Sequence, residues 1–253
     1  MFTIGYAAQT PTAPLAPFKF ERRNLRPNDV AMQILYCGVC HSDLHQARDD
    51  WGMSRYPIVP GHEIIGRVTE VGSAVSRYKV GDAVAVGCMV DSCQQCDQCR
   101  KGEEQLCRKN NTQTYNGLDR ITREPTYGGY SKHLVVREEF VLRVPDGLDL
   151  AKAAPLLCAG ITTYSPLRTW NGGPGSRVAV VGLGGLGHMA VKLAAGMGAF
   201  VTVLSRTPDK LDDALALGAD TLLVSTDAKA MAAARSSFDL IIDTIPVRHD
   251  VSP

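Results

Sequence analysis

The sequence predicts an α/β plus β fold in two parts: a β-rich domain over residues 1–150 and a parallel βαβ domain over residues 151–253. Short Val- and Ile-rich runs separated by Gly, Asp and Pro occupy the first part, as in barrel-like or irregular β domains. Buried strand-like runs alternate with helix-like segments in the second part. This alternation is typical of a parallel sheet whose crossover helices cover its faces.

The expected strands of the first part are apolar runs bounded by turn residues. They fall within residues 29–40, 63–75, 80–87 and 127–145, the last of which holds two strands. The second part begins with an Ala- and Leu-rich stretch, residues 149–167, that predicts a helix limited by Pro155 and Pro166.

Repeated strand and helix units are expected in the rest of the second part. A strand, a glycine turn, an apolar helix ended by Gly198 and a second strand span residues 177–207. Residues 209–224 predict another helix and strand, and residues 238–245 predict one more buried strand. The result is a parallel βαβαβ arrangement.

The composition is that of a globular enzyme, with 45% hydrophobic residues, 21% charged residues and a formal net charge of +1. This balance argues against nucleic acid or an anionic membrane as the main partner. No apolar run approaches the ~20 residues that span a bilayer, and the N-terminus does not resemble a secretory signal. We therefore expect a cytoplasmic protein whose eight cysteines are reduced.

Four cysteines lie close together in the sequence. Cys93, Cys96, Cys99 and Cys107 follow the spacing C-x2-C-x2-C-x7-C. Four thiolates on one short lobe suit a tetrahedral zinc ion whose positions are all filled by protein, which is a structural role. An iron–sulfur cluster and a chance grouping of cysteines are the alternatives.

Single residues scattered along the chain offer a second metal site. Cys40, His62 and Cys158 form a Cys2His set, the type in which zinc keeps a position open, and Glu63 is a candidate fourth ligand. Spacing alone does not establish this set, because a buried Cys is usually a small hydrophobic residue. A redox role for the Cys37 and Cys40 pair is an alternative, but the pair stands within β-rich sequence and redox pairs typically lie at a strand-to-helix turn.

The second part contains a glycine turn with a dinucleotide-binding pattern. Gly182, Gly184 and Gly187 form G-x-G-x-x-G between a strand and a helix, the context that this motif requires. The first Gly makes the turn, the second lets the backbone approach the pyrophosphate, and the third lets helix pack on strand. The helix N-terminus then faces the phosphates.

The end of the next strand predicts which cofactor binds. An NAD site usually carries a carboxylate there, but this sequence has Ser205, followed by Arg206 and, a little later, Lys210. A guanidinium without a carboxylate suits the 2′-phosphate of NADP(H). The alternative is that Arg206 is a solvated loop residue.

These motifs together resemble a known family. The segments "CGVCHSDLHQ", "PGHEIIGRVTEVG", "YGGYS", "PLLCAGITTYSPL" and "VGLGGLGHMAVKLA", with the four-cysteine lobe, resemble the zinc-dependent medium-chain alcohol dehydrogenases. The most similar subgroup is the cinnamyl alcohol dehydrogenase-like, NADPH-dependent aldehyde reductases. The resemblance implies a GroES-like catalytic domain, a Rossmann domain and hydride transfer between NADP(H) and an aromatic or aliphatic aldehyde or primary alcohol.

The resemblance also implies roles for individual residues. Catalytic zinc falls on Cys40, His62 and Cys158, with Glu63 able to approach it, and structural zinc falls on the four-cysteine lobe. Ser42 and His45 match a proton relay, and Asp43 matches the carboxylate that orients His62. Trp51, Cys88 and Thr112 match the substrate pocket. The implied cofactor-binding residues are Thr162, Gly182, Leu183, Gly184, Gly185, Leu186, Gly187, Ser205, Arg206 and Lys210. Full-length members are expected to be homodimers.

The sequence departs from the family at its end. Family chains continue into a second mononucleotide-binding half, so we expect a truncated chain with an exposed apolar sheet edge. A catalytically impaired module that only binds zinc and nucleotide is therefore an alternative function. Two enzymes of the same architecture are also candidates: a zinc-free quinone or enoyl reductase, and a sugar or polyol dehydrogenase.

Overall fold

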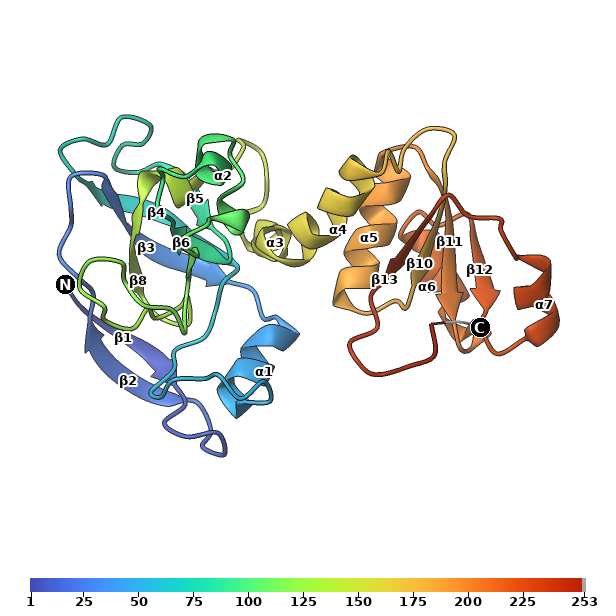
Figure 1. The fold of residues 1–253 in the computed structure, drawn as a ribbon, viewed down its shortest axis with the longest axis horizontal. Coiled ribbons are helices and arrows are strands. Elements are labelled where there is room, and N and C mark those ends of the chain that lie inside the picture. The colour runs from blue at the N-terminus through green and yellow to red at the C-terminus, as the bar shows by residue number, and fades with distance from the viewer. Residues whose placement is uncertain (252–253) are drawn as a thin grey trace. The chain divides into compact units, whose positions relative to one another are not determined.

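The structure is a computed structural model that describes residues 1–251, and it divides into two compact units, Met1–Cys158 and Ala159–Pro253 (Figure 1). The division falls after residue 150 because the next short helices pack on the first unit. Helix α3 (Leu150–Ala153) and a 3-10 helix (Ala154–Leu157) bury Ala153 and Ala154 in a cluster with Ile65 and Ala85.

The first unit is built around a five-stranded antiparallel sheet in the order β8-β3-β4-β5-β9. Its strands are β3 (Asp29–Cys37), β4 (Ile64–Val71), β5 (Ala83–Val86), β8 (His133–Arg137) and β9 (Leu142–Arg143). Met32, Ile64, Val84 and Val136 are buried together in its core. All five strands lie in the ranges expected from the sequence.

Smaller elements surround this sheet. They are the hairpin strands β1 (Phe2–Ala7) and β2 (Ala16–Glu21), helix α1 (His41–Arg48), strands β6 (Met89–Asp91) and β7 (Thr112–Gln113), helix α2 (Asp97–Arg100), and 3-10 helices Glu104–Leu106 and Glu138–Phe140. The expectation that the Cys37 and Cys40 pair stands within β structure was wrong. β3 ends at Cys37, and Cys40 is the N-cap of α1.

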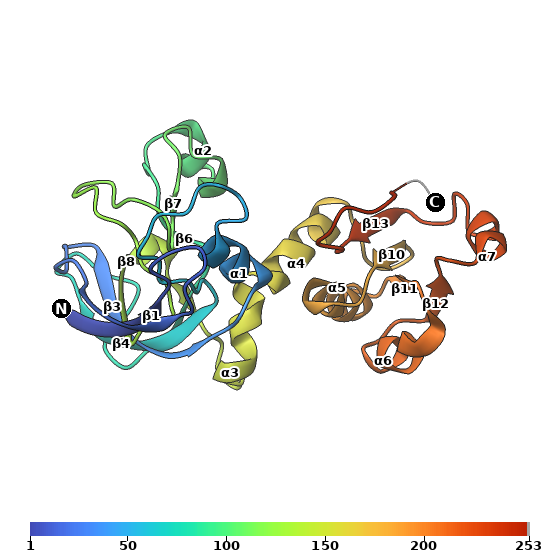
Figure 2. The same cartoon turned by 90° about the horizontal axis from the view of Figure 1, so that it is seen from below.

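The second unit is a parallel sheet in the order β12-β11-β10-β13. Its elements are α4 (Ala159–Thr169), β10 (Arg177–Val181), α5 (Gly185–Gly196), β11 (Phe200–Ser205), a 3-10 helix (Pro208–Lys210), α6 (Leu211–Ala216), β12 (Thr221–Val224), α7 (Ala228–Ala233) and β13 (Leu240–Asp243). Helices α5 and α6 lie on the same side of this sheet (Figure 2), as right-handed crossovers to successive neighbouring strands require. The expected βαβαβ arrangement is confirmed.

Two details of the second unit bear on the sequence predictions. Pro166 was expected to limit the first helix, but it lies inside α4. Proline removes one hydrogen bond, but the helix continues to Thr169, and the Trp170 N–H donates to the Pro166 carbonyl at 2.9 Å. Strand β13 forms one edge of this sheet, and its Ile241 is 59% exposed.

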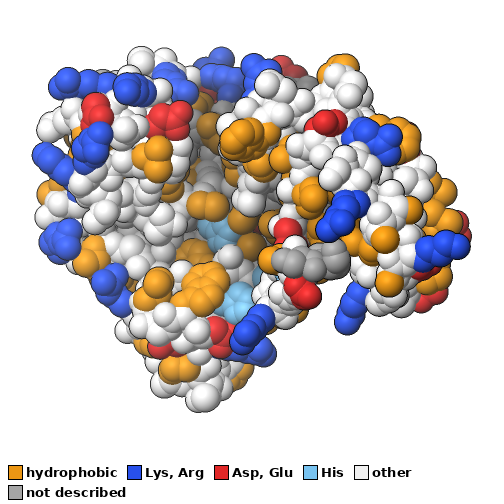
Figure 3. Space-filling model, turned by 45° about the vertical axis from the view of Figure 1, so that its right-hand side comes forward, with side chains coloured by type: hydrophobic (Ala, Val, Ile, Leu, Met, Phe, Trp, Pro, Cys, Tyr) orange, Lys and Arg blue, Asp and Glu red, His pale blue; other side chains and the backbone are white. Residues whose placement is uncertain are grey.

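The surface bears charges of both signs. On the face drawn in Figure 3, Lys and Arg side chains are interspersed with Asp and Glu side chains and with apolar ones. This mixture agrees with the formal net charge of +1. Among residues 1–251, no helix has both the length and the apolar character needed to cross a membrane.

Candidate metal centres and cofactor site

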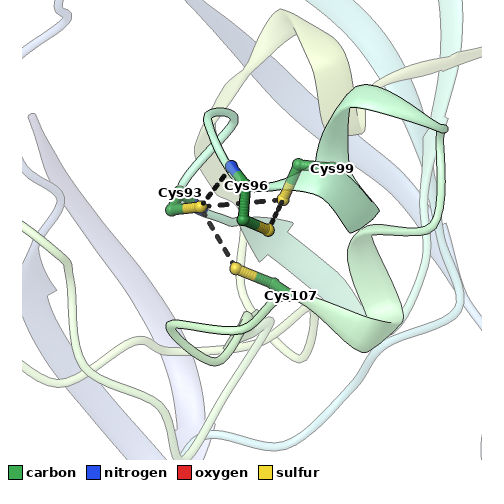
Figure 4. A group of neighbouring side chains, drawn as sticks. All are labelled: Cys93, Cys96, Cys99 and Cys107. Carbon is green, nitrogen blue, oxygen red and sulfur yellow. Dashed lines mark hydrogen bonds between the residues drawn. The ribbon is translucent and has the colours of Figure 1, made fainter.

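The four cysteines of the lobe point toward a common centre (Figure 4). Cys93 Sγ and Cys96 Sγ lie 3.9 Å and 3.5 Å from Cys99 Sγ, and the sulfurs of all four cysteines, including Cys107, lie within 4.8 Å of one another. These distances exceed the ~2.05 Å of a disulfide. Tetrahedral zinc with Zn–S bonds of about 2.3 Å places its sulfurs about 3.8 Å apart. The lobe therefore fits one zinc ion better than an iron–sulfur cluster, which separates its cysteines by a larger core.

Backbone groups of the lobe stabilise thiolates. The Cys96 and Gln95 N–H groups donate to Cys93 Sγ at 3.3 Å and 3.5 Å, and they lower the pKa of Cys93. Hydrogen bonds from the backbone of Cys99 and Arg108 lower the pKa of Cys96 to about 6. Thiolates are the form that binds zinc, so these amides favour that form at Cys93 and Cys96. The hydrogen bond with Ser92 lowers the pKa of Cys99, but burial and hydrogen bonds with Cys96 and Cys107 outweigh it and raise the pKa to about 11.

The scattered set is brought together by three segments of the first unit. Cys40 lies at the start of α1, His62 and Glu63 precede β4, and Cys158 follows the 3-10 helix that ends the unit. One ligand atom from each of the four residues lies within 4.8 Å of the others, and the two sulfurs are 3.8 Å apart. This separation again matches a tetrahedral zinc site.

Asp43 connects two residues of this set. Its Oδ1 accepts hydrogen bonds from His62 Nδ1 at 3.0 Å and from the Gly61 N–H at 2.9 Å, and its Oδ2 accepts one from the Cys40 N–H at 3.0 Å. Asp43 is only 3% exposed. Because Nδ1 of His62 faces the carboxylate, Nε2 is the nitrogen available to a metal.

The surroundings of this set favour the protonated forms of His62 and Cys40. Burial lowers the pKa of His62, but hydrogen bonds with Asp43, Cys158 and Cys40 outweigh burial and raise the pKa to about 12. The hydrogen bond with Cys158, together with burial, raises the pKa of Cys40 to about 11. A metal ion that binds here must displace these protons.

Helix α1 carries the predicted relay residues. The Ser42 N–H donates to Cys40 Sγ at 3.5 Å, which places Ser42 beside the metal ligand set. His45 follows three residues later and therefore lies on the same helix face. Its Nδ1 lies 2.7 Å from Asp50 Oδ2, and its ring packs against Trp51 with centroids 5.4 Å apart.

The other two predicted pocket residues lie in different surroundings. Cys88 is beside the scattered set, because its Sγ donates to the carbonyl of Leu157, the residue before Cys158, at 3.8 Å. Thr112 donates to the Leu118 carbonyl at 3.4 Å and lines a cavity of about 260 Å³ with Asp91 and other residues. The lining of that cavity does not include any residue of the scattered set.

Cys37 does not join either cysteine group. Its Sγ donates to the Gly38 carbonyl at 3.5 Å, and burial raises its pKa to about 12. A thiol with a raised pKa is a poor nucleophile, which argues against a redox pair with Cys40. Its sulfur packs against two glycines instead: a Cβ on Gly61 or Gly129 would lie 2.9 Å or 2.7 Å from it.

The glycine turn has the geometry of a dinucleotide site. Gly182 has φ of +87°, and a Cβ on Gly187 would lie 2.1 Å from the Gly182 carbonyl oxygen. Open space surrounds the Cβ positions of Gly184 and Gly185. The turn joins β10 to α5, and β10 lies between β11 and β13, where the strand order reverses. Ligands of such sheets bind at this switch point.

The remaining predicted cofactor residues are accessible. Arg206 and Lys210 are exposed and Ser205 is half-buried at the end of β11, where its Oγ accepts from the Thr207 N–H at 3.4 Å. Leu183 and Leu186 are half-buried in and after the glycine turn, and Thr162 is exposed on α4.

Sequence reasoning missed three residues at these sites. The Tyr130 hydroxyl donates to Asp43 Oδ2 at 3.0 Å, and the Tyr115 ring stacks on the His62 ring with centroids 5.8 Å apart. Thr244 follows β13, and its hydroxyl donates to the Val181 carbonyl next to the glycine turn at 2.8 Å. Tyr130 lies in the motif "YGGYS", which was the one available signal.

Comparison with known proteins assigns the chain to a family. Residues 26–146 match the alcohol dehydrogenase GroES-like domain, and residues 185–252 match the zinc-binding dehydrogenase domain. NADP-dependent alcohol dehydrogenase C 1 of Mycolicibacterium smegmatis is 55% identical over 253 residues, which cover 99% of this chain and 72% of that protein. The chain belongs to the zinc-binding dehydrogenase family. The resemblance inferred from its motifs is confirmed.

One further relative and two solved structures are also similar to the chain. Mannitol dehydrogenase of Petroselinum crispum is 55% identical over 94% of this chain and 71% of its own length. A cinnamyl alcohol dehydrogenase structure from Sorghum bicolor has a TM-score of 0.94 and 48% identity, covering 98% of this chain and 71% of that one. The Helicobacter pylori enzyme complexed with NADP(H) has a TM-score of 0.92 and 43% identity, over 99% and 71%.

Proposed function

We propose that the chain transfers hydride between NADP(H) and an aldehyde or primary alcohol at a zinc site formed by Cys40, His62 and Cys158, with Glu63 as a further ligand. The observation that carries this proposal is the convergence of these four residues within 4.8 Å. Membership of a dehydrogenase family supports the reaction class, and NADP-dependent relatives support the cofactor. The four-cysteine lobe is proposed to hold a second, structural zinc.

The residues of the scattered set have separate tasks. A zinc ion bound there would polarise a carbonyl oxygen as a Lewis acid, and a bound nicotinamide would supply the hydride. Cys40 and Cys158 contribute negative charge as thiolates, and the N-terminus of α1 stabilises the charge on Cys40. Asp43 holds His62 in the tautomer whose Nε2 is a lone-pair donor.

Ser42 and His45 are proposed to move the proton. Reduction of a carbonyl to a hydroxyl requires one proton for each hydride, and the Ser42 hydroxyl passes it from His45 to the substrate oxygen. Asp50 engages Nδ1 of His45 at 2.7 Å, so the other ring nitrogen exchanges the proton. In the oxidative direction the same groups carry the proton outward. Trp51, packed on His45, is proposed to contact the substrate.

The second unit is proposed to bind NADP(H). The open space at Gly184 and Gly185 admits the pyrophosphate next to the α5 N-terminus. Ser205 does not repel a 2′-phosphate as a carboxylate would, and the exposed side chains of Arg206 and Lys210 supply positive charge. Thr162 is proposed to lie close to the nicotinamide.

The direct test measures metal and turnover on one sample. The chain is expected to hold about two zinc ions and to oxidise NADPH with cinnamaldehyde. Cys158→Ala should lose one zinc and the turnover, whereas Cys37→Ala should keep both zinc ions. A wild-type chain with zinc only on the four-cysteine lobe would contradict the proposal. Two bound zinc ions without turnover would favour a module that only binds zinc and nucleotide.

A polyol is the second candidate substrate, because one relative at 55% identity is a mannitol dehydrogenase. Oxidation of mannitol with NADP+, measured beside cinnamyl alcohol, separates the two substrate classes. A cytoplasmic location is proposed, since its reducing conditions suit eight unpaired cysteines. Homodimer formation is also proposed, and light scattering on the purified chain tests it.

A further inference from the structure

Hydrogen bonds connect the Tyr130 hydroxyl to Asp43, and Asp43 to the proposed metal ligands His62 and Cys40. The four hydrogen bonds that Asp43 accepts are shared equally between its oxygens: His62 Nδ1 and the Gly61 N–H on Oδ1, the Cys40 N–H and the Tyr130 hydroxyl on Oδ2. A carboxylate only accepts, and a tyrosine hydroxyl near neutral pH carries its proton and donates. Of these four donors, Tyr130 is the one that donates from a side chain outside the proposed ligand set, and the Tyr115 side chain also interacts with Asp43.

The backbone of Tyr130 is held from two sides. The Tyr130 N–H donates to the Pro60 carbonyl at 2.9 Å, and its carbonyl accepts from the Tyr6 N–H in β1 at 2.8 Å. The Gly129 N–H also donates to the Gly61 carbonyl at 2.8 Å. The segment that carries Tyr130 is therefore paired with the loop that leads into His62, so the hydroxyl position is set by backbone pairing.

Gly61 makes this pairing close. It has φ of +102°, and a Cβ there would lie 2.7 Å from Tyr130 Cδ1 and 2.8 Å from the Tyr130 nitrogen. Only glycine allows both the backbone conformation and the approach. The chain thus brings the Tyr130 ring against the residue that directly precedes His62.

We infer that Tyr130 is a positioning residue for the catalytic metal site, because its hydroxyl fixes the Asp43 carboxylate and, through it, the His62 ring and the Cys40 backbone. This inference deepens the proposed function and rests on zinc binding at the scattered set. Without the hydroxyl, Oδ2 keeps one donor, and the carboxylate is free to rotate away from the plane that suits His62. Groups that support metal ligands in this way change metal affinity about 10–100-fold.

The structure favours the low end of that range. Tyr130 and Asp43 both line a groove of about 690 Å³ beside α1. A water molecule that enters from this groove would replace part of the lost hydrogen bond. We therefore expect Tyr130→Phe to weaken zinc binding at the scattered set about tenfold and to leave the four-cysteine lobe unchanged.

The test follows zinc release from the two-zinc protein to a chromogenic chelator. The release phase of the scattered set is the one that disappears in Cys158→Ala, and the lobe serves as an internal standard for folding. Tyr127→Phe is the matched control, because Tyr127 lies in the same segment as Tyr130 but its ring packs on Phe18 and Phe20 of β2. Cobalt substitution adds a spectroscopic signature, since displacement of His62 shifts the ligand-field bands of the scattered site.

The expected result is faster release from the scattered set in Tyr130→Phe alone, with shifted cobalt bands. The substitution should have no further effect in an Asp43→Asn background, because a residue that acts through Asp43 is not additive with it. Wild-type release rates and bands in Tyr130→Phe overturn the inference, and so does an undiminished effect in the Asp43→Asn background. A wild-type chain without zinc at the scattered set overturns the proposed function itself and is recognised before any variant is made.

Discussion

Alanine substitutions at Gly187 and Gly184, two glycines of the same turn, should affect different properties: stability at Gly187 and cofactor binding at Gly184. At Gly187 the added Cβ would lie 2.1 Å from the Gly182 carbonyl oxygen, whereas at Gly184 no atom lies within 4 Å of it. Gly187→Ala should therefore damage the packing of α5 on the turn. Gly184→Ala should leave the fold intact and obstruct the pyrophosphate.

The magnitude for Gly187→Ala follows from two opposing contributions. Overpacking costs about 1–3 kcal/mol, and the upper end applies because the obstacle is backbone. Gly187 lies within α5, where alanine is favoured over glycine by about 0.8–1.0 kcal/mol. The net loss is about 2 kcal/mol. For a unit of this size, each kcal/mol lowers the melting temperature by about 4–8 °C, so we expect a decrease of about 8–16 °C.

The expectation for Gly184→Ala concerns affinity. Gly184 is the N-cap of α5, where alanine is less favourable than glycine by about 0.5 kcal/mol, so stability should change little. A methyl group between backbone and pyrophosphate should remove one charge-assisted hydrogen bond, worth about 1.5–3 kcal/mol. NADPH should then bind about tenfold to hundredfold more weakly.

Calorimetric melting and NADPH fluorescence titration on both variants test this pair. Unchanged NADPH affinity in Gly184→Ala would refute the position assigned to the pyrophosphate. Unchanged melting of the second unit in Gly187→Ala would refute the close packing of α5 on the turn. Equal loss of stability in the two variants would show that the open space at Gly184 does not exist.

Three further predictions concern the cofactor, protons and the first unit. Arg206→Ala should weaken NADPH binding about tenfold and leave NADH binding unchanged, because only NADPH carries the 2′-phosphate; equal losses in fluorescence titrations would contradict this. Zinc uptake by the scattered set at pH 7 should release at least the protons held by Cys40 and His62, because their pKa values are raised to about 11 and about 12, and its apparent affinity should rise with pH. Calorimetry in buffers of different ionisation enthalpy that shows no proton release would refute this. Gly61→Ala should lower the free energy of unfolding by denaturant by about 2–4 kcal/mol. Gly52 also has positive φ but has open space around its Cβ position, so Gly52→Ala should lower it less. Equal losses would contradict the contact with Tyr130.

Features with local causes were predictable from the sequence. The glycine turn between β10 and α5 needs only neighbouring residues, and the buried strands β10 and β11 are recognisable as continuous apolar runs. The four-cysteine lobe closes within residues 93–107, so its spacing alone predicted the grouping that the structure shows. The five strands of the first sheet were predictable because each lies in a short apolar run bounded by turn residues.

Other features gave weak local signals. Helix α1, with the sequence HSDLHQAR, buries only Asp43 and has no apolar stripe, so it was missed. Pro166 was expected to limit α4, and only the hydrogen bonds of the folded helix show that it continues. Tyr130 lies in the motif "YGGYS", but that motif does not indicate its partner, because its role depends on the pairing of residues 128–130 with residues 59–61.

The sequence by itself determined the residue types for two metal sites, the glycine turn and the missing carboxylate after β11, because each is a property of one short segment. Tertiary structure alone decided that Cys40, His62, Glu63 and Cys158 meet within 4.8 Å, and that Cys37 does not join them. The physical reason is that these residues come from segments far apart in the chain. Their separation is set by the burial of β4 against its neighbours and by the hydrogen bonds that Asp43 collects, which no local pattern encodes.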